Sequence, residues 1–322
     1  MRKKNLLPRV KASKQNPCNE SPATETAVSI RPTNNIEIAL NWLKNFHEPW
    51  NKVEEKWTVT SKYRRDVLIA SRSQAKERRT ESMKAAAYLD DYKVLRLSHG
   101  YTLIEIDFVI SCQPGFEDAL ITNWSSFIQK IDSILKNSSF LIKDPEGKML
   151  RQLYFKTTNK EAKDILLMQC LSSLLPPSRQ VQLGTKKFKP TIKESRDAFI
   201  VNVKIPGQVV NFITERREKI CNQFGRSASV QPYILYVGKE QDVIDEVLVV
   251  IDNFCYKLES FQHALDVCFK TFFVLDIVFT AQCDHVWLLI QKALYGFTTT
   301  DDINILKVTS FLKKLELMDK EN

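Results

Sequence analysis

The chain has 322 residues, of which 43% are hydrophobic and 26% are charged, and its formal net charge is +9. This composition is typical of a globular protein of about two domains and excludes a wholly disordered chain. Because no run of 18 apolar residues occurs and no apolar segment follows the basic start of the chain, we expect neither a membrane span nor a secretory signal.

The seven cysteines are widely spaced and form no C-x-x-C pair. In a chain without a secretory signal, this pattern is typical of reduced and mostly buried thiols. We therefore expect the protein to be located in the cytoplasm or the nucleus.

The positive charge is concentrated in two segments. Residues 1–36 and residues 62–84 each carry a net charge of +5, which leaves the rest of the chain almost neutral. Residues 1–35 are rich in Lys, Pro, Ser, Thr and Asn, so we expect a disordered basic tail. Such a tail suits a nuclear-import signal or weak contact with phosphate groups, and the alternative is a solvated tail without a partner.

The first elements in chain order are two helices. Apolar side chains at helical spacing predict a helix over residues 36–46, which ends before Pro49. The basic segment 62–84 has few helix breakers, so it is expected to be a helix that is polar nearly all round. Its basic side chains are candidate phosphate contacts without base readout: Lys62, Arg64, Arg65, Arg72, Lys76, Arg78 and Arg79. The alternative is a helix whose charged face contacts only solvent.

Three further elements complete the first half of the chain. Alternating aliphatic side chains predict a strand over residues 104–110. Helical spacing predicts a helix over 116–131 and another over 161–175, before two consecutive prolines. Residues 178–193 are polar and rich in lysine, and we expect a linker between domains there.

The second half mixes strands and helices. Residues 199–203 predict a strand, and a helix is expected from the turn at 206–207 to Phe224, with Gly225 as its cap. The short apolar runs 233–237 and 247–251 predict two central strands.

The last predicted elements are helices. The first begins after Ser260 as its N-cap, and its spacing predicts a buried face and an exposed set of side chains. The buried face comprises Phe261, Leu265, Cys268, Phe269 and Phe272, and the exposed set comprises Gln262, His263 and Lys270. A helix over 286–294 should end at Gly296, and Thr299 with Asp302 resembles a capping box that opens the final helix.

Together these elements predict an α+β fold with mixed α/β layers. The expected organisation is a tail at 1–35, a helical region with one strand at 36–177, a linker at 178–193 and an α+β domain at 194–317.

The sequence offers few groups that suggest catalysis. The widely spaced glycines form no phosphate-binding loop and no serine-hydrolase elbow. The soft ligands His263, Cys268, Cys283 and His285 lack the close pairs typical of zinc sites. Asp107, Asp252 and Asp276 lie near the ends of apolar runs, where a two-metal nuclease would place carboxylates, but aspartate is also a common turn former. We therefore expect no enzymatic activity, no cofactor and no metal.

Several segments of the sequence resemble one protein family. The segments ESRDAFIVNV, QPYILYVG and ALDVCFKTFFVLDIVFTAQCDHVWLLIQKALYG are similar to the C-terminal region of the sterile alpha motif domain-containing protein 3-like group. The segment GYTLIEIDF, with Trp57, Tyr63 and Arg64 upstream, resembles another block of the same group, so the likeness covers about residues 42–316. It implies no catalytic residue and no cofactor. Longer members resemble a fusion to a sterile alpha motif domain, which mediates protein association, whereas residues 1–36 are not expected to encode one. The group resembles a multi-copy lineage, as expected for descent from a mobile element.

Two hypotheses of function follow. The first is a non-enzymatic intracellular module that binds another protein through its almost neutral body. The alternative is a nucleic-acid-associated protein, derived from a mobile element, that uses the basic tail and the basic helix without sequence preference. Neither hypothesis includes a membrane or a small-molecule substrate.

Overall fold

The computed structural model describes residues 31–74, 88–137, 144–183, 186–224 and 230–321. Of the expected basic tail, only residues 31–35 fall within this part, and helix α1 begins there at Asn34. The expected cap Gly225 lies outside the described residues, and so do Lys76, Arg78 and Arg79 of the basic segment.

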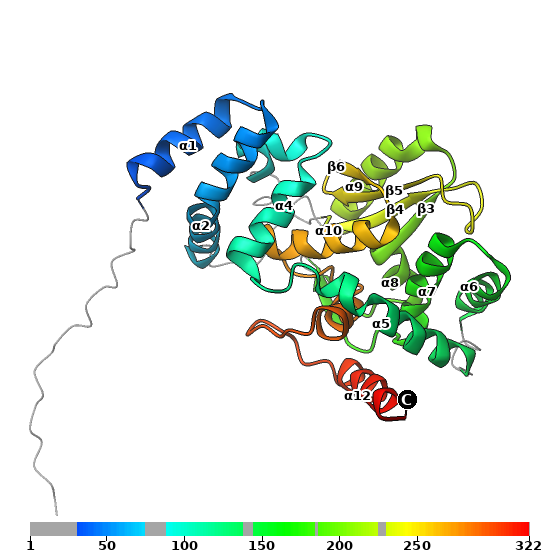
Figure 1. The fold of residues 1–322 in the computed structure, drawn as a ribbon. Helices are drawn as coiled ribbons and strands as arrows, with labels where there is room; N and C mark the ends of the chain where they lie inside the picture. The colour runs from blue at the N-terminus through cyan, green and yellow to red at the C-terminus, as the bar shows by residue number, and fades with distance from the viewer. Residues whose placement is uncertain (1–30, 75–87, 138–143, 184–185, 225–229, 322) are drawn as a thin grey trace, which may run out of the picture. The chain divides into compact units, whose positions relative to one another are not determined.

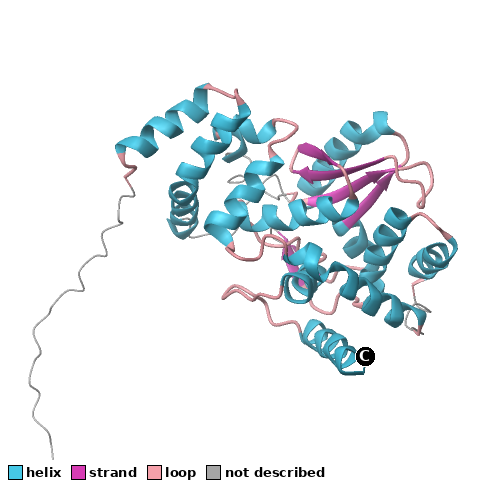
Figure 2. Cartoon of the chain, in the orientation of Figure 1, coloured by secondary structure: helices cyan, strands magenta, loops and turns pink. Residues whose placement is uncertain are grey.

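The described chain combines many helices with two small sheets, so the α+β prediction is confirmed (Figure 2). The chain starts with α1 (Asn34–Asn45) and α2 (Trp50–Gln74). Helix α2 begins upstream of the basic segment and buries a face of Val53, Trp57, Thr60 and Ser61, while within residues 62–70 the buried side chains are Arg64 and Leu68. In the described residues, no helix combines the length and the apolar character that a membrane span needs.

The strand expected over residues 104–110 is wrong, because this segment is helical. Helix α4 (Tyr101–Asp107) continues directly into the π-helical turn η3 (Phe108–Cys112). The fully or almost fully buried positions are Leu103, Ile104, Asp107 and Phe108, which follow helical rather than alternating spacing. The strand prediction rested on the alternating isoleucines. The segment packs against both α2 and helix α10 (Phe261–Val274). This tertiary packing overrides the local preference for a strand.

Three helices complete the first half. Helix α5 (Ala119–Lys136) and helix α7 (Lys160–Leu174) lie where sequence periodicity predicts them. Helix α6 (Pro145–Lys156), which packs against α7, was not predicted. Helix α7 is a central element, since every residue from Ile165 to Leu174 is buried.

In the described residues, a four-stranded sheet has the order β3-β4-β5-β6. Its strands are β3 (Ile200–Val203), β4 (Tyr233–Val237), β5 (Glu246–Ile251) and β6 (Phe254–Leu258). The first three confirm the strand predictions. Strands β3 and β4 are parallel and are connected through α9 (Val209–Phe224), whereas the other neighbours are antiparallel.

Both faces of this sheet are covered. Ile234 and Tyr236 of β4 contribute to the main hydrophobic core, which α10 and α7 share, whereas Tyr233, Leu235 and Val237 belong to a second core beneath α9. Figure 1 shows α10 lying across the strands and α9 behind them. A strand buried on both faces carries a continuous apolar run, and this explains why β4 and β5 could be predicted from the sequence.

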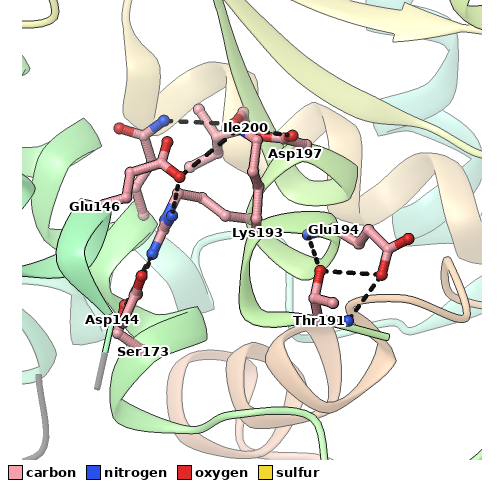
Figure 3. A network of polar contacts seen from close by, with 10 residues as sticks. Asp144, Glu146, Ser173, Thr191, Lys193, Glu194, Asp197 and Ile200 are labelled. Atoms are coloured by element: carbon pink, nitrogen blue, oxygen red, sulfur yellow. Dashed lines mark hydrogen bonds and ion pairs between the residues drawn. The ribbon is translucent and has the colours of Figure 1, made fainter. Parts of the chain in front are cut away.

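The expected linker at 178–193 contains secondary structure. Strands β1 (Val181–Leu183) and β2 (Lys186–Phe188) form a hairpin, and α8 (Ile192–Phe199) begins with a capping box of Thr191 and Glu194. Figure 3 shows this box near Asp144, Ser173 and Glu146. Arg196 of α8 contacts these three side chains in a network of polar contacts.

That network ties α8 to α6 and α7. Arg196 Nη2 lies 2.5 Å from Asp144 Oδ2, and both side chains are buried. The main core also draws on both expected domains, and Pro32–Asn322 forms one compact unit. The division of 36–177 from 194–317 is therefore absent from the structure, because a polar surface segment resembles a linker in composition alone.

The buried face predicted for α10 is confirmed, and Ser260 caps the helix by accepting a hydrogen bond from the His263 amide. Lys270 was expected to be exposed, and this is wrong, since only 4% of its surface is accessible. Its ammonium group reaches Asp266 one turn earlier, and its aliphatic stem lies in the core.

The C-terminal helices differ in one respect from expectation. Helix α11 (Asp284–Ile290) and the π-helical turn η6 (Gln291–Tyr295) end at Gly296, whose φ is 75°, as predicted. Thr299 does not open the final helix, because its hydroxyl donates to the Asp302 carboxylate within a loop. Helix α12 begins instead at Leu306 and extends to Glu321.

Candidate functional site

The three aspartates considered for metal-dependent chemistry do not converge on one site. Asp107 Oδ1 lies 2.6 Å from Arg64 Nη2, and Asp252 Oδ2 lies 2.6 Å from Arg217 Nη1. Asp276 Oδ1 lies 3.9 Å from Arg65 Nη2. Each carboxylate therefore has its own arginine, and Asp252 and Asp276 occupy turns with positive φ. No group of three or more His, Cys, Asp or Glu within the described ranges is placed to hold a metal ion.

The thiols considered as zinc ligands lie in the core. Cys268 and Cys283 are fully buried, and burial raises the pKa of both thiols above their ordinary range. A nucleophilic cysteine needs the opposite shift, because the thiolate is the reactive form. His263 is half-buried, and its Nε2 lies 3.0 Å from Glu105 Oε1 rather than near either thiol.

One constellation that the sequence did not reveal resembles a catalytic triad. Ser195 Oγ lies 3.3 Å from His285 Nε2, and His285 Nδ1 lies 3.6 Å from Asp284 Oδ1. Ser195 is completely inaccessible and also donates to Ser172, so its hydroxyl is part of the buried hydrogen bonding between α7 and α8. The cavity beside His285 measures about 10 Å³, which is room for about one water molecule. This arrangement stabilises the fold and cannot admit a substrate.

The described part of the basic segment is partly engaged inside the protein. Arg64 is buried, stacks over the Trp57 ring at 3.5 Å and donates to Asp107, so it cannot contact phosphate in solution. Arg65 is half-buried and donates to the Phe273 carbonyl. Lys62 is exposed. Of the remaining candidates, Arg72 lies on α2, and the other three fall outside the described residues.

A cleft of about 830 Å³, called here the aromatic cleft, opens on the described structure. Its walls come from the β1–β2 hairpin, the C-terminal end of α10, the turn that follows α10, and the loop before α12. The side chains that carry the argument are Phe272, Phe273, Val278, Phe279, Leu288 and Ile303. Val278 and Ile303 are 45% and 47% exposed, so aliphatic side chains at the rim face solvent.

Most charged groups of the aromatic cleft have a partner of opposite charge, and Lys187 and Asp301 line it as well. Arg179 pairs with Asp284, and Arg65 lies near Asp276. Asp302 accepts from Gln291 at 2.9 Å and lies 3.3 Å from Lys292. Because most of these charges are paired, the aromatic and aliphatic side chains of the floor are expected to determine which ligand binds.

Sequence reasoning did not find this cleft, because its residues are separated along the chain from Arg65 to Ile305 and share no spacing. Comparison with protein-family models, curated proteins and solved structures finds no match to this chain.

Proposed function

We propose that this chain is a non-enzymatic protein-interaction module whose aromatic cleft binds an apolar segment of another protein. The observation that carries the proposal is the combination of an aromatic floor, an aliphatic rim and mostly paired charges in a cavity of about 830 Å³. A cavity of this size accommodates several side chains of a peptide, and apolar burial supplies the affinity.

The groups that would support an enzyme are engaged elsewhere. The buried serine–histidine pair has no access to substrate, and the aspartates pair with separate arginines. The contacts of Arg64 and Arg65 add no support to the nucleic-acid alternative, which remains a separate hypothesis.

The test is a selection from a displayed library of random peptides, followed by affinity measurement on purified protein. We expect the selected peptides to be rich in Leu, Ile, Phe or Trp. The double variant V278E/I303E should bind them about tenfold or more weakly, because docking would then bury unpaired carboxylates. The matched control is V210E, since Val210 is 73% exposed on α9 and does not line the cleft.

Selected peptides that bind the wild type, V210E and V278E/I303E equally well would place the binding surface elsewhere. A selection that enriches no peptide would contradict the proposal. Circular dichroism of each variant confirms that the fold is retained.

A further inference from the structure

A second groove, called here the acidic groove, has a volume of about 690 Å³ and differs from the aromatic cleft in its charge. It lies between α4, η3, the beginning of α5 and the N-terminal part of α10. Its charged and titratable lining groups are Glu105, Glu117, Asp118, His263, Asp266 and Lys270. With His263 neutral, the described lining carries a net charge of −3.

Lys270, the cation at the floor of the acidic groove, is already paired with a carboxylate. Lys270 Nζ lies 2.6 Å from Asp266 Oδ2 and donates to the Glu117 carbonyl oxygen at 3.1 Å. The second oxygen of Asp266 accepts from the Tyr295 hydroxyl at 2.5 Å. Both charged side chains are buried, so the floor is a closed and neutral pair.

The negative charge is therefore left at the rim. Glu117 and Asp118 are exposed in the turn that leads into α5, and Glu105 is partly exposed beside His263. None of the described cations that line the groove pairs with the carboxylate of Glu117 or Asp118, in contrast to the paired walls of the aromatic cleft.

Aliphatic side chains lie among these carboxylates. Ile106 and Val109 are half-buried, whereas Ile110 of η3 is 43% exposed and Ile121 of α5 is 64% exposed. An exposed aliphatic strip bordered by uncompensated carboxylates favours an occupant with aliphatic side chains flanked by lysine or arginine.

We propose that the acidic groove binds a basic amphipathic segment of a partner protein. The aliphatic side chains of the segment pack on Ile110 and Ile121, and its cations lie opposite Glu117 and Asp118. Because the whole chain carries a net charge of +9, long-range attraction does not favour a cationic ligand, and the local charge of the groove must select it. This site shares no residue with the aromatic cleft, so either proposal can fail without the other.

The test uses fluorescence anisotropy with a labelled amphipathic peptide of fourteen residues composed of Leu and Lys at helical spacing. Two comparison peptides carry the same pattern with Glu or with Ser in place of Lys. We expect the Leu/Lys peptide to bind, with an affinity that falls as salt is raised, and we expect neither comparison peptide to bind detectably.

The decisive variants neutralise the rim without altering the buried floor. E117Q/D118N should weaken binding of the Leu/Lys peptide about five- to tenfold, and I121S should weaken it by a similar factor. The matched control is E215Q/E218Q, which removes the same charge from α9 on the other face of the sheet and should leave the affinity unchanged.

Equal weakening by E117Q/D118N and E215Q/E218Q would reveal a response to net charge alone and would overturn the proposal. Binding of the Ser peptide as tight as that of the Lys peptide would assign the groove to a neutral apolar occupant, which also overturns it. The V278E/I303E variant should still bind the Leu/Lys peptide, and this separates the acidic groove from the aromatic cleft.

Discussion

Arg64 illustrates how a charged residue in a basic segment becomes part of the core. Its guanidinium stacks on Trp57, donates to the Trp57 carbonyl at 2.7 Å and pairs with Asp107 at 2.6 Å. The sequence could not distinguish it from Lys62, because burial depends on which side of α2 contacts α4 and η3. The planar guanidinium of arginine holds its N–H donors in a fixed geometry, so it suits such a buried pair better than the flexible ammonium of lysine.

Replacing Arg64 should destabilise the fold strongly. In R64M the side-chain length is nearly kept, but Asp107 remains as a buried and uncompensated carboxylate, so we expect a loss of about 3–5 kcal/mol in the free energy of unfolding. Chemical denaturation measures this loss. The loss in R64M/D107N should be clearly smaller than the sum of the two single losses, and additive losses would show that the pair is not coupled.

His263 gives the stability a defined pH dependence. Its hydrogen bond with Glu105 raises its pKa above the ordinary value of 6.5, against the opposing effect of burial. The folded state thus favours the protonated ring, so the stabilisation is complete below pH 6.5 and is lost as the pH rises through the folded-state pKa.

The variant H263Q should therefore melt below the wild type at pH 5.5, and the difference should shrink toward pH 9. Melting temperatures across this range measure it, with H99Q as the control for loss of an exposed histidine. A difference that stays constant with pH would contradict the role of the Glu105 pair.

Among the helices and strands, the sequence correctly predicted the elements whose burial follows one simple pattern. Strands β4 and β5 are buried on both faces and carry continuous apolar runs, and α10 has one dominant apolar face. Residues 101–112 were assigned wrongly because their aliphatic side chains pack on two sides of a helix. The edge strand β6 was missed, since its burial is interrupted at Lys257 and its first residues are only half-buried.

The basic segment was predicted as one helix with two competing roles, and salt dependence separates them. If it contacts phosphate groups, the double substitution R78A/R79A lowers the slope of log K against log salt concentration by about two. We expect instead no detectable DNA binding at physiological salt, because Arg64 and Arg65 are engaged internally. A steep salt slope that R78A/R79A reduces would restore the nucleic-acid alternative.

At the scale of the whole molecule, the shared core has a consequence for unfolding. Phe108 lies 6.5 Å from Phe269 and Trp124 lies 6.4 Å from Phe261 between ring centroids, so the aromatic core links elements across the expected boundary. The aromatic cleft and the acidic groove are likewise built from segments that are distant in the sequence, and no local motif predicts such a site. The sequence therefore predicted the fold class but neither the single core nor the aromatic cleft and the acidic groove.

We expect residues 36–177 and 194–317 to unfold together. Hydrogen exchange in increasing denaturant, read on peptides from α5 and from β4, should show loss of protection at one common midpoint. Two separate midpoints would show that the halves are independent domains. Far-UV circular dichroism provides the global midpoint for comparison.

Helix α10 also constrains how this protein can diverge. In the described structure eleven of its fourteen residues are buried, and the other three are Gln262, His263 and Phe273. Gln262 and His263 line the acidic groove, and Phe273 lines the aromatic cleft. The helix therefore has no neutral position, since a substitution alters either the core or a binding surface. New partner preferences can therefore arise from α10 most readily at these three positions, whereas a substitution at one of its buried positions destabilises the fold even where that residue also lines a surface.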